Sequence, residues 1–226
     1  MRLFLVRHAE TEWNELKRYQ GHMDIQLSRR GHEQARMVAA RLALEDISAV
    51  YSSDLTRARS TAEEIAATHA LEVETRRALR EVDVGAWEGL SIEEIRERFP
   101  EDFERWKKDS ANVRFPQGES YLDVKVRAMP VIDEIVRRHR AREEGAVVVS
   151  HSGPLKVIIC TLLGLDLNER YRFSLANASV SLVTFVDGLP PRLELLNDTC
   201  HLLPLAASSC QAGYSPNTRS PKNDGA

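Results

Sequence analysis

Short apolar runs and longer amphipathic segments alternate along the chain. Six segments have the length and the hydrophobic pattern of β-strands: residues 3–6, 47–51, 71–75, 146–150, 179–186 and 192–196. The first, second and fourth of these are largely apolar, as in strands that are buried on both faces. The last two are joined by the sequence DGLPP, whose composition is typical of a turn.

Between these runs, apolar residues recur every three or four positions, which predicts helices with one buried face. Ser28 is the expected N-cap of a first helix, and Asp54 that of a second. Further helices are expected at residues 91–98 and 120–139. Pro130 lies within the last of these, and because proline has no backbone N–H to donate, we expect a kink or a late start there.

Strands that alternate with helices predict the α/β class. We expect a mostly parallel central sheet with helices on both faces, and an antiparallel edge formed by the last two strands. Residues 1–204 are predicted to form one domain, in which residues 80–118 are an insertion that forms part of a substrate pocket. Residues 205–226 are rich in Ser, Ala, Asn, Pro and Gly without periodicity and are predicted to be a disordered tail.

The composition is that of a soluble globular protein, with 42% hydrophobic and 29% charged residues in a chain of 226. A formal net charge of −3 argues against a general affinity for nucleic acid or for an anionic membrane surface. No apolar run reaches the ~18 residues of a membrane helix, and the first run is too short for a signal-peptide core, so we expect a cytoplasmic location. Three widely spaced cysteines predict neither a disulfide framework nor a metal site.

Arginines and histidines follow three of the predicted strands. Arg7 and His8 end the first strand, and Arg57 lies in the first turn of the helix after the second. His151 follows the run at residues 146–150. Because the carboxyl ends of parallel strands lie at one edge of a sheet, where helix N-termini also attract anions, we expect these side chains to meet there. Together they predict a site for a dianion such as a phosphate group, with a neutral imidazole as candidate nucleophile.

Taken one at a time, the same residues have simpler interpretations. A single histidine at a strand end is more often structural, Arg57 alone would be a solvated helix charge, and Glu81 alone a surface carboxylate. Lys156 has two interpretations, a residue near the pocket and a surface residue of the helix after His151, of which the second is favoured. His22 has two interpretations, a residue that faces the substrate and a simply exposed one. The ordered set, rather than any member of it, indicates function.

Four motifs together resemble the histidine phosphatase superfamily, in the branch related to phosphoglycerate mutase. They are Arg-His near the N-terminus, SSDLTRA at residues 52–58, a glutamate before VDVGAWEG at residues 82–89, and SHSG at residues 150–153. The resemblance extends from Met1 to about Leu203. It implies a three-layer α/β/α sandwich, in agreement with the alternation of strands and helices.

The resemblance also implies roles for individual residues. His8 matches the nucleophile that becomes phosphohistidine, Glu81 matches the proton donor to the leaving group, and the other catalytic positions are Arg7, Arg57 and His151. Contacts with the substrate phosphate are implied for Arg7, Asn14, Gln20, Gly21, Arg57, His151 and the backbone amide of Ser152. Since the arginines supply the positive charge, neither a metal nor a cofactor is expected.

The implied activity is that of a metal-independent phosphomonoesterase for a small phosphorylated metabolite. The spacing and loops are most similar to the α-ribazole-phosphate phosphatases of cobalamin biosynthesis, and they also occur in broad-specificity phosphatases. The alternative enzymes are a cofactor-dependent phosphoglycerate mutase, whose stretch between the proton donor and the second histidine is longer, a fructose-2,6-bisphosphatase-like enzyme and a protein phosphohistidine phosphatase. A phosphate-binding scaffold is the alternative without catalysis. The sequence leaves the oligomeric state open, with a homodimer as one alternative.

Overall fold

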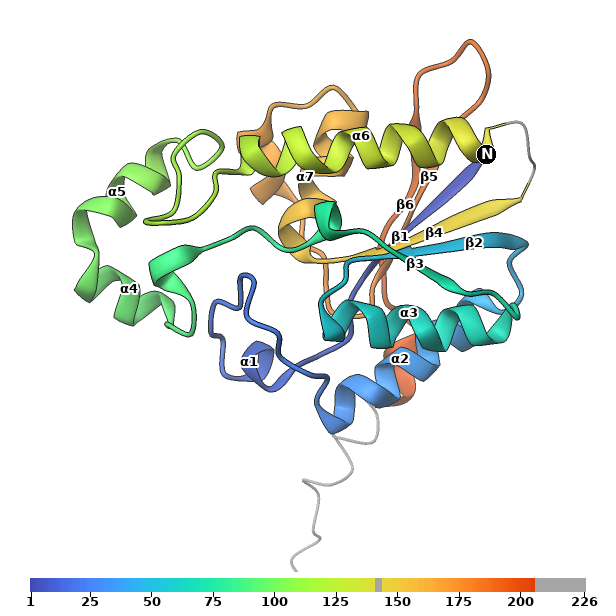
Figure 1. Ribbon diagram of the computed structural model, residues 1–226, viewed down its shortest axis with the longest axis horizontal. Coiled ribbons are helices and arrows are strands. Elements are labelled where there is room, and N and C mark those ends of the chain that lie inside the picture. Colours follow the sequence, from blue (N-terminus) through green and yellow to red (C-terminus); the bar gives the residue numbers. More distant parts are fainter. Residues whose placement is uncertain (141–143, 206–226) are drawn as a thin grey trace, which may run out of the picture.

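One mixed β-sheet forms the middle of the molecule (Figure 1). The computed structural model describes residues 1–140 and 144–205, and within them six strands pair in the order β3-β2-β4-β1-β5-β6. The strands are β1 (Arg2–Arg7), β2 (Ile47–Ser52), β3 (Val73–Thr75), β4 (Gly145–Ser150), β5 (Val180–Thr184) and β6 (Arg192–Asp198). The first four are parallel to one another, whereas β5 and β6 are antiparallel to their neighbours, which confirms the predicted sheet and its antiparallel edge.

Helices cover both faces of this sheet. The α-helices are α1 (Glu12–Glu15), α2 (Arg29–Leu42), α3 (Thr56–Thr68), α4 (Ile92–Arg98), α5 (Pro100–Lys108), α6 (Tyr121–His139) and α7 (Ser152–Leu162). The 3-10 helices are η1 (Arg77–Leu79), η2 (Gly85–Trp87), η3 (Leu167–Arg172) and η4 (Cys200–Leu202). Helices α2 and α3 pack on one face, and α6 and α7 on the other (Figure 1). The expected three-layer α/β/α sandwich is therefore confirmed.

Alternate side chains of β1 enter two separate cores. Phe4 packs with Val38 of α2 and with residues of α3, whereas Leu5 packs with Ile132 of α6 and with residues of α7. This follows from the two-residue period of a strand, which sends successive side chains to opposite faces. Each fully buried apolar side chain contributes about 1.5–3 kcal/mol relative to its exposed state. The strand that carries Arg7 at its end is thus anchored on both faces.

The segment at residues 80–118 forms a third apolar cluster beyond the carboxyl edge of the sheet, where α4 and α5 project from the body (Figure 1). Trp87 is fully buried in it, with its ring centroid 5.1 Å from that of Phe115 and 5.6 Å from that of Trp106. Cys160 of α7 belongs to the same cluster. The segment therefore packs against the helix that begins next to His151, although helix α5 was not among the predicted elements.

Two details of the helices correct the sequence analysis. The N-cap of α3 is Leu55 and not Asp54, because both carboxylate oxygens of Asp54 accept hydrogen bonds from Arg80, each at 2.7 Å. Helix α6 runs through Pro130 from its start at residue 121, so the late start was wrong. The carbonyl that loses its partner at Pro130 is that of Val126, a residue that is 69% exposed and whose carbonyl can bond water instead.

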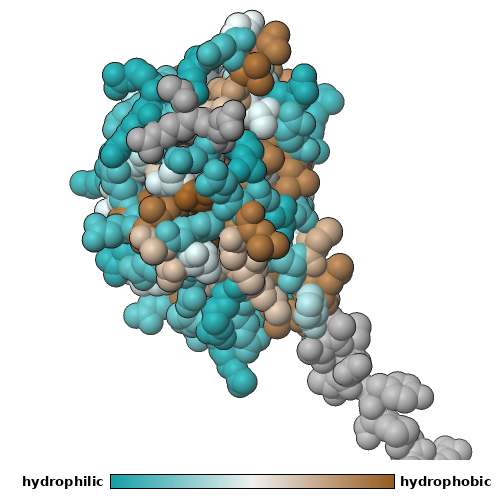
Figure 2. Space-filling model, turned by 90° about the vertical axis from the view of Figure 1, so that its right-hand side faces the viewer, coloured by the Kyte–Doolittle hydropathy of each residue, from teal (hydrophilic) through white to brown (hydrophobic). Residues whose placement is uncertain are grey.

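The end of the sheet at which β1 and β4 begin lies opposite the α4–α5 segment (Figure 1). Figure 2 shows this end as a mainly hydrophilic surface with small apolar groups. Among the residues that the structure describes, no helix is both long and apolar enough to cross a membrane. Of the predicted C-terminal tail, only Leu205 falls within the described residues, and the domain boundary at residue 204 stays a prediction.

Candidate active site

The predicted arginines and histidines lie together at the carboxyl edge of the sheet. Strands β1 and β4 are adjacent and in parallel register, so that Arg7 lies opposite Ser150. The backbone N–H of His8 donates to the Ser150 carbonyl at 2.9 Å, which brings the next residues of both strands side by side. The ring centroids of His8 and His151 are 5.0 Å apart. The parallel pairing of two distant strands is therefore what joins the two histidines.

His8 is held in a defined neutral form. It is 2% exposed, and its Nδ1 lies 2.7 Å from the Ala9 carbonyl oxygen. Because a carbonyl can only accept a hydrogen bond, Nδ1 carries the proton and the lone pair is on Nε2. Burial, and then the charges of Arg57 and Arg7, hold the pKa of His8 well below its usual 6.5. At a pH above this lowered pKa, the Nε2 atom is unprotonated and can act as a nucleophile.

His151 is buried beneath Arg57 and does not itself line the pocket. Its Nδ1 accepts a hydrogen bond from Arg57 Nε at 3.2 Å, so its proton is on Nε2, which donates to Ser53 Oγ at 2.9 Å. Burial, and then the charge of Arg57, lower the pKa of His151 well below 6.5. A neutral His151 therefore fixes the orientation of the Arg57 guanidinium.

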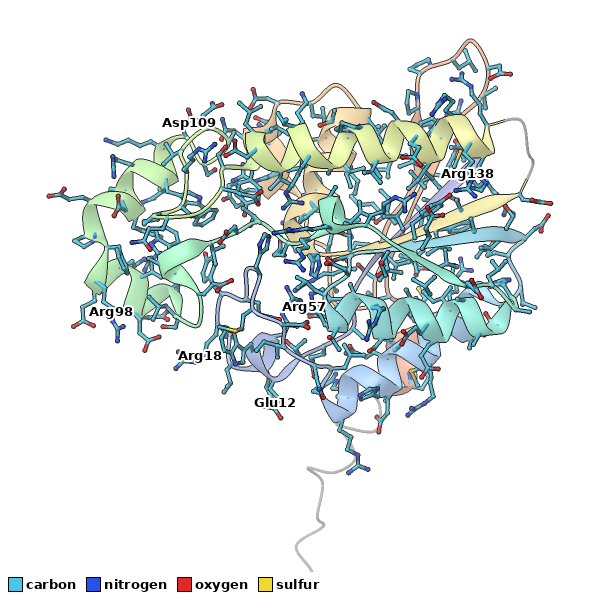
Figure 3. The ribbon with its side chains drawn as sticks, in the orientation of Figure 1. Glu12, Arg18, Arg57, Arg98, Asp109 and Arg138 are labelled. Carbon is cyan, nitrogen blue, oxygen red and sulfur yellow. The ribbon has the colours of Figure 1, made fainter. Side chains whose placement is uncertain are left out.

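Arg57 lies at the start of α3 (Figure 3), and its side chain is fully buried. Its Nη1 donates to the Met23 carbonyl at 2.7 Å and its Nη2 to the Gly21 carbonyl at 2.9 Å. Burial lowers its pKa to about 10, which leaves the guanidinium charged at neutral pH. Gly21 has a φ of +49°, and a Cβ there would overlap the Glu88 carboxylate, so this backbone turn requires glycine.

Arg7 and Asn14 offer donors to the same pocket. Arg7 Nη1 donates to the Leu175 carbonyl at 2.6 Å, whereas its buried Nε has no partner within residues 1–140 and 144–205. The Oδ1 atom of Asn14 accepts from Asn177 Nδ2 at 3.1 Å and from the Thr11 backbone at 3.0 Å. Asn14 can therefore meet an anion only through its amide nitrogen. Burial lowers the pKa of Arg7, and the nearby charge of Glu81 opposes that shift.

Glu81 faces the start of α7. Its Oε1 accepts hydrogen bonds from the Val82 backbone N–H at 2.9 Å and the Gly153 N–H at 3.2 Å. A Cβ on Gly153 would overlap this oxygen and lie 3.1 Å from Tyr121 Cε1. The backbone N–H of Ser152, the first residue of α7, is one of the amides that a helix leaves without an internal partner. The glutamate and the helix N-terminus thus meet the arginines across one pocket.

That pocket has a volume of about 310 Å³, which suits a small molecule. Of the residues named from the sequence, those that line it are Arg7, His8, Asn14, Gln20, Gly21, Arg57, Glu81 and Ser152. The segment at residues 80–118 contributes Val82 and Val84 besides Glu81. His22 instead has its Nε2 bonded to the Glu81 carbonyl at 2.8 Å and is not part of the lining.

Sequence reasoning missed seven residues that line the pocket, which are Lys17, Arg18, Tyr19, Tyr121, Lys156, Arg170 and Tyr171. The interpretation of Lys156 as a surface residue was wrong, because it is half-buried and lines the pocket. A signal was present, since Lys156 lies four residues after Ser152 and so shares its face of α7. Arg18, on the loop after α1, lies toward α4 (Figure 3), where it donates to Glu94 at 3.1 Å.

Comparisons with known proteins agree with this geometry. A model described as "Histidine phosphatase superfamily (branch 1)" matches residues 3–199. Phosphoserine phosphatase 1 of Hydrogenobacter thermophilus is 42% identical over 202 residues, which is 89% of this chain and 94% of that protein. A mycobacterial glucosyl-3-phosphoglycerate phosphatase, solved with VO3, has a TM-score of 0.80 at 30% identity and covers 88% of this chain and 99% of its own. A candidate alpha-ribazole-5'-P phosphatase from Escherichia coli also has a TM-score of 0.80, at 27% identity, with coverages of 88% and 96%.

Proposed function

Because the chain belongs to branch 1 of the histidine phosphatase superfamily and is a phosphatase, we propose that it hydrolyses a small phosphorylated metabolite through a phosphohistidine on His8. One observation carries this proposal. The His8 imidazole is buried, neutral and fixed through Nδ1 to the Ala9 carbonyl, which leaves Nε2 free beside Arg7 and Arg57. A phosphate group between those two cations would meet that nitrogen in line with its ester bond.

In the first step, His8 Nε2 forms a bond to phosphorus while the ester P–O bond breaks. The departing oxygen takes a proton from Glu81. The imidazole ring gains a positive charge, which the Ala9 carbonyl stabilises through the Nδ1–H bond. In the second step, water attacks phosphorus, its proton passes to the Glu81 carboxylate, and the P–N bond breaks. His8 returns to its neutral form with the proton still on Nδ1.

The transferred phosphoryl group would lie among fixed donors. These are Arg7 Nε, the Arg57 guanidinium, the side chains of Asn14 and Gln20, and the backbone N–H groups of Gly21 and Ser152. His151 acts chiefly through Arg57, because both of its ring nitrogens already have partners. Such preorganised donors stabilise the charge of the transition state more strongly than water does. Positioning and electrostatics are therefore the main source of the rate, and neither a metal nor a cofactor takes part in the proposed steps.

The relatives favour phosphoserine as the first ester to test. One relative is named for phosphoserine and one structural neighbour for glucosyl-3-phosphoglycerate, and both of these esters carry a carboxylate. The α-ribazole phosphate that the motifs suggested is the substrate for which the Escherichia coli neighbour is named, and a place in cobalamin biosynthesis stays a prediction from the sequence. Phosphoglycerate mutase and fructose-2,6-bisphosphatase activities stay as alternatives within the same chemistry.

The test is a hydrolysis panel in the presence of EDTA. It compares phosphoserine, 3-phosphoglycerate, α-ribazole 5'-phosphate, fructose 2,6-bisphosphate and p-nitrophenyl phosphate. Rapid quenching with a radiolabelled substrate should trap an acid-labile phosphoryl group on the wild-type chain. His8→Ala should lose both turnover and label, whereas His32→Ala, which changes an exposed histidine of α2, should lose neither. Mutase turnover that exceeds hydrolysis in the presence of bisphosphoglycerate, or full activity of His8→Ala, would overturn the proposal.

A further inference from the structure

The pocket holds more positive charge than a phosphate group needs. Within the residues that the structure describes, its lining includes six basic side chains, of arginine or lysine, and one carboxylate, that of Glu81. Arg7 and Arg57 border His8, and Arg18 is paired with Glu94. A phosphomonoester carries about two negative charges near neutral pH, which those first two arginines balance. Of the three remaining cations, Lys17 is exposed to solvent, whereas Lys156 and Arg170 are withdrawn from it and are thus available to a second negative group on the same ligand.

Lys156 is the first of these cations. It lies four residues after Ser152 and three after Gly153, and helical side chains lean toward the N-terminus of their helix. Its Nζ lies 5.9 Å from the centroid of the Phe173 ring, and Lys156 lines the pocket together with Ser152 and Glu81. Among the described residues, Lys156 forms no ion pair. Burial, and then Arg7 and Arg170, lower its pKa, which places its charge near both the phosphate site and the outer wall.

Arg170 is the second. It is 1% exposed, and its guanidinium carbon is 3.7 Å from the ring centroid of Tyr121 and 4.2 Å from that of Tyr171. Nη1 donates to the Leu167 carbonyl and Nη2 to the Tyr171 hydroxyl, each at 2.8 Å. Its buried Nε has no partner in the described part of the chain, nor does any carboxylate there pair with it.

A guanidinium so thoroughly desolvated is costly unless an anion compensates it. The two tyrosine rings and the two fixed hydrogen bonds hold it in one orientation, so little further ordering is needed when a ligand binds. A buried Arg170 that pairs with no carboxylate of the described residues, together with a half-buried Lys156, has the features of an anion site rather than of a structural ion pair. Because the cavity is small, this site and the phosphate site would bind two groups of the same ligand.

We propose that Lys156 and Arg170 form a second anion subsite, which binds a carboxylate on the organic part of the phosphoester. This inference rests on the proposed phosphatase function, because it takes the phosphate to lie between Arg7 and Arg57. The substrate class is then the phosphate esters of small hydroxy acids, including hydroxy amino acids. Esters whose organic part has no negative charge, such as α-ribazole phosphate, leave the subsite empty.

Two matched pairs of substrates isolate the carboxylate. Phosphoserine and phosphoethanolamine differ by that group, as do 3-phosphoglycerate and glycerol 3-phosphate. The measured quantity is the ratio of kcat/KM within each pair. In the wild-type enzyme we expect the acid to be preferred about 10- to 100-fold, the range for a hydrogen bond to a charged group. The preference should arise mainly in KM, because the carboxylate is bound equally in the ground and transition states.

Lys156→Met removes the charge and keeps the length of the side chain, and it should reduce that ratio toward one. Lys107→Met, at an exposed position of α5, is the matched control and should leave the ratio unchanged. Arg170→Lys keeps a charge but loses the planar group between Tyr121 and Tyr171, and it should also lower the ratio. Thermal unfolding of each variant separates a lost contact from a lost fold.

The outcomes distinguish this subsite from the function on which it rests. A wild-type enzyme that hydrolyses p-nitrophenyl phosphate but shows no preference within either pair would refute the subsite and leave the phosphatase intact. Equal losses on both members of a pair in Lys156→Met would also refute it, because the lysine would then act on the phosphate. An enzyme that forms no phosphohistidine with any ester would refute the proposed function itself.

Discussion

Replacing Glu81 with glutamine separates proton transfer from positioning. Oε1 of Glu81 accepts hydrogen bonds from the N–H groups of Val82 and Gly153, and the glutamine carbonyl oxygen can accept both in the same place. What Glu81→Gln loses is the proton for the leaving group. A positioned general acid contributes roughly 10²–10⁴ in rate, or about 3–5 kcal/mol of barrier at 1.36 kcal/mol per tenfold. We expect a loss of this size in kcat/KM for phosphoserine, whose alkoxide must be protonated as it leaves.

The assay compares phosphoserine with p-nitrophenyl phosphate, whose leaving group departs without a proton. For the aryl ester the loss in kcat/KM should stay below about tenfold, because kcat/KM reports the first step, in which this leaving group needs no proton from Glu81. The substitution also removes a negative charge that acts on Arg7 and Arg57, but this affects both substrates alike and cancels in their ratio. Glu104→Gln, at an exposed position of α5, controls for the change of charge. Equal losses on the two esters would refute the assignment of Glu81 as proton donor.

Two further predictions follow from the buried site. Gly153→Ala should lower kcat/KM for phosphoserine at least about tenfold, because the new Cβ overlaps the Glu81 carboxylate and approaches Tyr121. The chain should stay folded, because alanine favours a helix. Steady-state kinetics and thermal unfolding measure the two effects, and unchanged kinetics would contradict the prediction. Burial holds the pKa of His8 and His151 well below 6.5, so the unfolded chain binds more protons than the folded one in mildly acidic solution. Their contribution to stability is complete above pH ~6.5 and is lost as the pH falls below it, by up to about 1.4 kcal/mol per pH unit for each histidine. Urea unfolding between pH 7.5 and 5.5 should show this slope, and a slope equally steep in His8→Asn would contradict the assignment to His8.

The inner half of the site, around His8, could be predicted because its position follows from the order of the strands and helices along the chain. A residue that ends a parallel strand lies at the carboxyl edge whatever the details of packing, and this rule places His8, His151 and Arg57 together. Asp54 shows where local pattern fails. It has the side chain of an N-cap, but a guanidinium of Arg80, 26 residues later, takes both of its oxygens. Tertiary pairing of this kind leaves no trace in a local window.

The outer half could not be predicted because its position depends on packing between segments. Lys156 was recoverable from helical spacing alone. Arg170 was not, since its place beside Tyr121 depends on how η3 packs against α6 and α7. Helix α5 is only nine residues long, and two aromatic residues three positions apart, Phe103 and Trp106, are its main apolar signal. Such a short pattern does not distinguish a helix from an irregular loop.

The separate packing of the third apolar cluster has an evolutionary consequence. His8 follows strand β1, which packs into both main cores. Val82 and Val84 belong instead to the cluster around Trp87, and Tyr121 packs against that cluster. We expect that a substitution in that cluster reshapes the pocket wall while the packing of β1 is kept. Over evolution, changes in the pocket wall can therefore alter the choice of substrate, while the residues that transfer the phosphoryl group keep their positions.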